Sequence, residues 1–72
     1  MNKKIFLNSQ YIEIPNKPLH YEHILNLAGF PIDSSISVTF SMKDGTQGSL
    51  FQHTSVQPQN GMIINVTRTD KA

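Results

Sequence analysis

Three histidines and five carboxylates are the side chains of this 72-residue chain that could perform acid–base or metal chemistry. His20 and His23 stand three positions apart, so they could share a helix face and hold a metal with help from Glu22 or His53. Two histidines without a third ligand at a characteristic spacing are a weak signal. A solvated helix face explains them better, and we predict no metal site.

Nucleophilic and phosphate-transfer chemistry find no support either. The chain has no cysteine, so it cannot be a thiol-relay enzyme, and no nucleophile-elbow motif surrounds its serines or threonines. The segment Gly45–Gly48 is not followed by the Lys-Ser/Thr pair of a phosphate-binding loop. No carboxylate pair shares an evident cleft. The prediction is a protein that is not an enzyme and holds no cofactor.

The overall charge excludes some partners. The formal net charge is +1, Arg68 is the only arginine, and no basic stripe exists to neutralise phosphates, so we expect no nucleic acid partner. The apolar run Ile5–Leu7 is too short for a signal peptide, and nothing reaches transmembrane length. The lack of cysteine fits a reducing compartment. We expect a cytoplasmic protein with no membrane partner.

The candidate residues must be positioned by strands, because apolar and polar residues alternate through most of the chain. A hairpin is expected within residues 1–14, with a turn at 8–10, and further strands at 36–41, at 49–51 and at 62–67. Asn60-Gly61 is a strong turn signal before the last strand. The alternation predicts that one set of residues points inward: Ile5, Leu7, Met62, Ile64 and Val66.

One helix of about ten residues is expected from about Leu19, where the spacing changes to 3.6 residues per turn. Ile24, Leu27 and Ala28 form its predicted apolar stripe, and Gly29 is its predicted left-handed C-cap. Hairpin, helix and three strands make an α+β domain, with one helix across one face of a mixed sheet of four to five strands. The first and last strands should pair at its centre. Residues 1–68 form the expected domain, and residues 69–72 a flexible tail.

Three segments of the chain resemble the bacterial multiubiquitin-type family of ubiquitin-like domains: Tyr21–Gly29, Ser37–Phe40 and Gly61–Lys71. The first strand, Lys4–Leu7, is also similar to the start of ubiquitin itself. The closing block is the most specific part, because Asn65 and Asp70 have no obvious packing role. The resemblance implies a ubiquitin-like β-grasp fold.

It also implies a function as a protein modifier. Its expected partners are an ATP-dependent ubiquitin-activating-like enzyme, a ubiquitin-conjugating-like enzyme, a JAB-type metalloprotease, and target proteins or other acceptors. The C-terminal carboxylate would be adenylated, passed to an enzyme nucleophile and joined to an amine or hydroxyl. The residues expected to form the conjugation or processing tail are Arg68, Thr69, Asp70, Lys71 and Ala72.

This tail departs from the Gly-Gly end of ubiquitin and of small sulfur carriers. Glycine leaves room for the tail in the narrow channel of an activating enzyme, whereas Lys71 is bulky. Three alternatives remain open: the cognate enzymes accept this tail, a protease trims it, or the domain is not conjugated. The missing Gly-Gly argues against a sulfur carrier.

A second candidate site is the outward face of the predicted sheet. Its expected partner-binding residues are Phe6, Tyr11, Thr39, Ile63, Asn65 and Thr67. Large apolar residues on neighbouring central strands could bind a partner, although scattered exposed apolar residues are also normal. The rival hypothesis is therefore a β-grasp protein–protein interaction module that is not conjugated.

Overall fold

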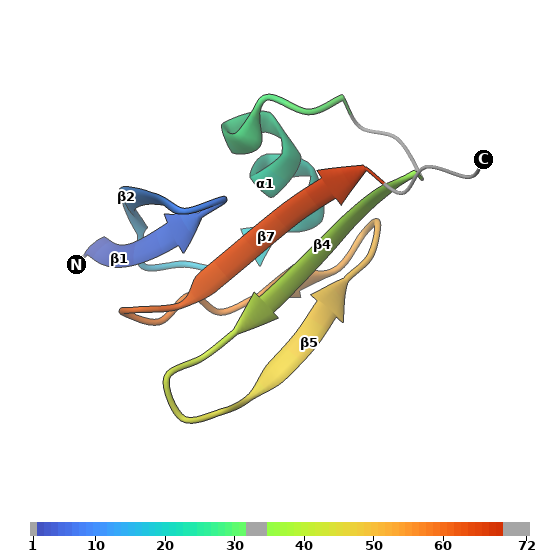
Figure 1. The fold of residues 1–72 in the computed structure, drawn as a ribbon. Helices are drawn as coiled ribbons and strands as arrows, with labels where there is room; N and C mark the ends of the chain where they lie inside the picture. The colour runs from blue at the N-terminus through green and yellow to red at the C-terminus, as the bar shows by residue number, and fades with distance from the viewer. Residues whose placement is uncertain (1, 32–34, 69–72) are drawn as a thin grey trace.

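The computed structural model describes residues 2–31 and 35–68, and it contains one twisted five-stranded sheet with a helix across one face (Figure 1). The strand order is β2-β1-β7-β4-β5; β1 and β7 are parallel, and the other pairs are antiparallel. The elements of this sheet and its helix are β1 (Asn2–Leu7), β2 (Gln10–Pro15), α1 (Tyr21–Ala28), β4 (Ile36–Ser41), β5 (Gln47–Leu50) and β7 (Ile63–Arg68). This is a β-grasp-like α+β fold, as predicted.

A tight turn joins the two strands of the N-terminal hairpin. Asn8 and Ser9 both have positive φ values, 50° and 69°, which suit the two-residue turns that match the twist of antiparallel strands. Gln10, predicted as part of the turn, already pairs with Leu7 and begins β2. The hairpin itself is confirmed.

The first and last strands lie side by side, as predicted, although their direct pairing is short. Phe6 pairs with Ile63 and Leu7 with Ile64. Two asparagine side chains extend this contact at its ends. The Asn8 amide donates to the Val66 carbonyl at 3.1 Å and accepts from the Val66 N–H at 2.8 Å. At the other end, Asn60 Oδ1 accepts the Lys4 N–H at 2.9 Å.

The helix is shorter than expected at its N-terminus. Leu19 and His20 form a short strand, β3 (Leu19–His20), which pairs with β6 (Ser55–Val56), so α1 begins only at Tyr21. The sequence pattern did not predict this small second sheet, since two-residue strands have no readable alternation. No helix within residues 2–31 and 35–68 is long and apolar enough to cross a membrane.

The helix ends as predicted, at a left-handed glycine. Gly29 has φ 78°, and its N–H donates to the Asn26 carbonyl at 3.2 Å. The Phe30 N–H donates to the Leu25 carbonyl at 2.9 Å. These two bonds satisfy carbonyls at the helix C-terminus, and they need the backbone conformation that glycine adopts without steric cost.

The predicted apolar stripe of the helix was wrong at one position. Leu27 is 44% exposed, whereas Tyr21, Ile24 and Leu25 are buried and Ala28 packs at the edge of the core. Positions 21, 24, 25 and 28 form one continuous helical stripe. The helix is therefore turned toward Leu25 and away from Leu27, because the buried Tyr21 also has to reach the core.

The core lies between α1 and one face of the sheet. Its sheet side consists of buried residues at alternate positions: Ile5, Leu7, Ile14, Ile36, Val38, Leu50, Ile64 and Val66, with Met62 just before β7. The predicted inward set is therefore confirmed. Tyr21 adds a polar anchor, since its hydroxyl donates to the Ile36 carbonyl at 2.9 Å within this core.

The strand β5 begins two residues before the predicted segment 49–51 and ends one residue before the end of that segment. Its pairing with β4 runs from Gln47 to Leu50, while Phe51 is exposed and starts a turn in which its N–H donates to Thr54 Oγ1 at 2.9 Å. The alternation of apolar and polar residues could not predict that β5 begins at Gln47, because Gly48 carries no side chain. A Cβ atom at Gly48 would lie 2.7 Å from the Phe40 ring, so the ring uses the space that glycine leaves.

Candidate functional site

The face of the sheet that α1 does not cover carries an apolar row across three neighbouring strands. Tyr11 on β2 pairs with Phe6 on β1, and Phe6 pairs with Ile63 on β7. These side chains are 57%, 38% and 43% exposed, respectively. The two aromatic rings are tilted against each other, with centroids 5.1 Å apart. We call Tyr11, Phe6 and Ile63 the apolar row.

The same face is polar toward β4 and β5. Thr39 pairs with Asn65 and Ser37 pairs with Thr67, and all four residues are exposed. Thr39 and Asn65 also line a shallow hollow of about 450 Å³ near the edge of the sheet. The predicted outward residues are thus brought together on one face, with the apolar ones at one side and the hydroxyl and amide groups at the other.

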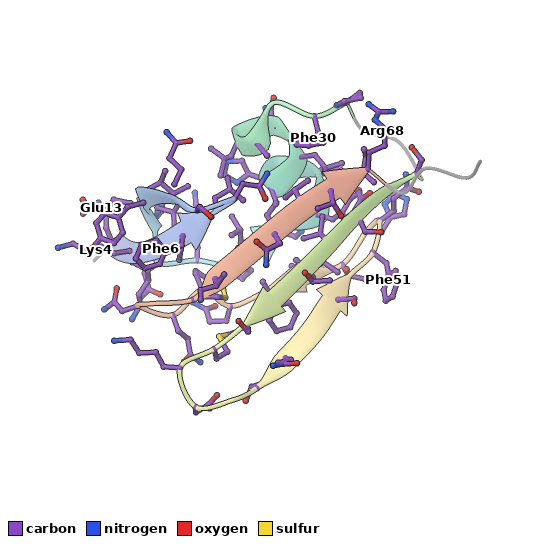
Figure 2. All side chains as sticks on the ribbon, viewed as in Figure 1. Lys4, Phe6, Glu13, Phe30, Phe51 and Arg68 are labelled. Carbon is purple, nitrogen blue, oxygen red and sulfur yellow. The ribbon has the colours of Figure 1, made fainter. Side chains whose placement is uncertain are left out.

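A second shallow hollow, of about 390 Å³, adjoins the apolar row at the N-terminal end of β1. Lys4 and Lys43 line it together with Phe6 and Tyr11. Figure 2 shows Lys4 and Phe6 close together at this end of the sheet. Neither lysine is among the predicted partner-binding residues. Lys4 could have been found, since it lies two positions before Phe6 on the same face of a strand, but Lys43 comes from a loop.

The predicted tail begins at the opposite end of β7. Arg68 is the last residue of this strand, is exposed, and pairs with Ile36 of β4. It follows Ile63 by five positions, which corresponds to about 17 Å along a strand. Figure 2 shows Arg68 and Phe6 well separated on the molecule. Thr69, Asp70, Lys71 and Ala72 lie outside the described residues.

Glu22 on α1 contacts the loop after β5. Its carboxylate accepts the His53 N–H at 3.2 Å and lies 4.0 Å from His53 Nδ1, so it connects the helix to the loop after β5. Hydrogen bonds from the Glu22 N–H and the His53 N–H lower the pKa of Glu22. No group of three or more metal-binding side chains occurs within residues 2–31 and 35–68.

The other described carboxylates are also bound to their own surroundings. Asp44 accepts the Thr46 N–H at 2.9 Å, and this bond, with one from the Thr46 side chain, lowers the pKa of Asp44. Glu13 accepts from the Asn2 amide at 3.1 Å. Asp44 orders the turn after Lys43, and Glu13 stands across the strands from Lys4.

Comparisons with known proteins found no match among family models, curated proteins or solved structures. The features that bear on function are therefore those of the chain itself: a β-grasp-like body, an exposed face with an apolar row, and a C-terminal segment that follows the central strand.

Proposed function

We propose that this chain is a ubiquitin-like protein modifier. Its tail carboxylate, either as it stands or after trimming by a JAB-type metalloprotease, is activated by a ubiquitin-activating-like enzyme and ATP. A ubiquitin-conjugating-like enzyme then transfers the chain to target proteins or other acceptors. The observation that carries this proposal is the position of β7, which is hydrogen-bonded between β1 and β4 and leads directly to residues 69–72.

The fold supports this proposal because a modifier needs a rigid body and a defined starting point for its reactive arm. β1 and the Asn8 side chain hold β7 on one side, and β4 pairs with it as far as Arg68 on the other. The residues after Arg68 thus start from a fixed place at the end of the sheet. The resemblance of Gly61–Lys71 to multiubiquitin-type domains supports the same function.

In the acyl-transfer steps, the activated carbonyl carbon of the chain is the electrophile. The carboxylate oxygen attacks the α-phosphate of ATP, which forms an acyl-adenylate and releases pyrophosphate. An enzyme thiolate then displaces AMP to give a thioester, and an acceptor amine or hydroxyl displaces the thiolate. Because the chain has no cysteine, the thiolate that displaces AMP comes from another molecule, as does the acceptor amine or hydroxyl. Reduced thiols and ATP are both available in the cytoplasm, which we propose as the compartment.

The test is to incubate the chain with its cognate activating enzyme, ATP and magnesium, and to follow the products by intact mass. Variants that end at Thr69, Asp70 and Lys71 are tested in parallel, because trimming within residues 69–72 could expose the reactive carboxylate. We expect at least one form to give an adenylate or a covalent adduct. If all of them remain unmodified, the chain is not a modifier.

A second candidate function is a protein-binding module that is not conjugated, and the exposed apolar row favours it. The two functions predict opposite results for two changes. If the chain acts only by binding, removal of residues 69–72 leaves activity and partner binding intact, while Phe6→Ala or Ile63→Asp abolishes binding. A modifier instead loses its activity when residues 69–72 are removed.

A further inference from the structure

We propose that the face of the sheet that α1 does not cover, the helix-free face, binds a protein segment. In this segment an apolar side chain is flanked by carboxylates. The apolar side chain packs on the apolar row, and the carboxylates approach the ammonium groups of Lys4 and Lys43. This inference names the chemistry of the partner for the surface described above. It rests on the second candidate function, protein binding through the apolar row, and does not require conjugation.

The two lysines reach the apolar row from distant parts of the chain. Lys4 is on β1 beside Phe6, and the Gly61 N–H donates to the Lys4 carbonyl at 2.8 Å. Lys43 follows β4, and its side chain passes directly over Gly61. Both lysines line the hollow of about 390 Å³ together with Phe6 and Tyr11. The fold therefore surrounds one end of the apolar row with two cations.

Gly61 is what allows Lys43 to lie in this position. A Cβ atom at Gly61 would lie only 3.0 Å from Lys43 Cδ, and the glycine has φ 84°, a conformation that side chains disfavour. The aliphatic part of Lys43 therefore covers backbone, and the residue as a whole is exposed. The lysine stem adds apolar area to the hollow, while its charge remains available at the edge.

Neither ammonium group is neutralised by a contact within the described residues. The ion pair found there joins Glu22 and His53, on another part of the molecule. Glu13 lies across from Lys4 but binds the Asn2 amide, and Asp44, beside Lys43, binds Thr46. Two cations with no ion-pair partner among residues 2–31 and 35–68, next to exposed aromatic rings, are complementary to an anionic, apolar ligand.

Carboxylates are favoured over nucleic acid phosphates as the anionic groups. Two lysines neutralise few phosphates, and the side chains that line the neighbouring hollow, such as Thr39 and Asn65, carry no charge. A peptide with carboxylates on both sides of a leucine fits two cations at the edge of an apolar row. An oligonucleotide is therefore the competing ligand in the test.

The experiment titrates the isotope-labelled full chain with a short synthetic peptide that carries leucine flanked by glutamates, and monitors backbone amides by NMR. A matched peptide has glutamine in place of each glutamate. We expect the acidic peptide to shift the amides of Lys4, Phe6, Tyr11, Lys43 and Ile63. It should bind about fivefold more tightly than the glutamine peptide, which corresponds to roughly 1 kcal/mol, and the difference should shrink at high salt.

Two charge-reversal variants make the test specific. Lys43→Glu should weaken binding of the acidic peptide by about fivefold or more, because it replaces an attraction with a repulsion. Lys17→Glu changes the net charge by the same amount at a lysine that does not line the hollow, and it should leave the affinity unchanged. Circular dichroism establishes that both variants are folded.

Three results would overturn the proposal: equal binding of the two peptides, shifts that map away from the apolar row, or tighter binding of an oligothymidylate than of the acidic peptide. The titration contains no enzyme and no ATP. A negative result therefore leaves the activation assay unaffected, and a failed activation assay likewise leaves the binding result unaffected.

Discussion

Ile63 and Ile64 are neighbours of the same type, yet the fold gives them opposite environments. Ile64 is completely buried among the core residues, whereas Ile63 is 43% exposed beside Phe6 on the helix-free face. The alternation of a β-strand explains the contrast, because successive side chains point to opposite faces. The register of β7 therefore decides which isoleucine stabilises the fold and which one is available to a partner.

Aspartate substitutions at these two positions should consequently have very different effects. Ile64→Asp places a carboxylate in the core and should cost several kcal/mol. A domain of this size is typically stable by about 4 to 11 kcal/mol, so this variant should be largely unfolded. Ile63→Asp should cost less than about 1 kcal/mol. Urea titrations followed by circular dichroism measure both, and similar losses in the two variants would contradict the register.

Tyr21 provides a second contrast at the scale of single residues. Tyr21→Phe removes a buried hydroxyl that donates to the Ile36 carbonyl, and it should lower the free energy of unfolding by about 1 to 2 kcal/mol. Tyr11→Phe is the matched control, because Tyr11 is 57% exposed and its ring contact with Phe6 is retained. The control should change stability by less than about 0.5 kcal/mol. Equal effects would show that the Tyr21 hydroxyl does not stabilise the core.

At the scale of elements, the contact between β1 and β7 depends on a side chain. β1 ends at Leu7, and direct pairing with β7 ends at Ile64. The Asn8 amide then pairs with both backbone groups of Val66, as the next residue of a longer strand would do. A turn residue thus extends the pairing of the strand that leads to the proposed tail.

Substitutions of Asn8 should separate its hydrogen bonds from its backbone conformation. Asn8→Gly removes both bonds to Val66 but tolerates the positive φ, and it should cost about 1 to 3 kcal/mol. Asn8→Ala also loses the bonds and should cost roughly 1 kcal/mol more, because alanine disfavours this conformation. Hydrogen exchange of the Val66 amide should accelerate in both variants. Unchanged exchange would rule out the proposed role of Asn8.

At the scale of the whole molecule, the buried core and Arg68, where the proposed tail begins, are separate. The described core extends along the sequence from Ile5 to Val66, and strands from both ends of this range meet at the centre of the sheet. Since the apolar row and Arg68 lie at opposite ends of β7, a partner on the apolar row leaves the end of this strand accessible. Docking and reaction can therefore use different parts of one surface.

A variant that ends at Arg68 should therefore retain the folded domain. We expect its melting temperature to differ from that of the full chain by no more than about 2 °C, since the described core contains no residue beyond Val66. In the binding experiment it should also match the full chain. A loss of stability above about 1 kcal/mol would show that residues 69–72 belong to the folded unit.

The sequence by itself determined most of the sheet. Strict alternation around Ile5 and Ile64 defined which face of each central strand is buried, because that pattern has a period of two and a shift of one residue would expose the core. The glycine at position 29 likewise defined the helix end, since its backbone conformation is a local property. These features depend on neighbours along the chain, and so they could be predicted from it.

Tertiary structure decided what depends on residues that are distant in sequence. The rotation of α1 buries Leu25 and exposes Leu27, and it accompanies the burial of Tyr21, whose hydroxyl donates to the Ile36 carbonyl. The hollow beside the apolar row was equally beyond prediction, because it forms only where Lys43 crosses Gly61 next to Lys4. Periodicity shows which side of a strand is buried. It does not show which loop lies beside the exposed side. Here the loop after β4 brings the second charge, that of Lys43, to the proposed binding surface.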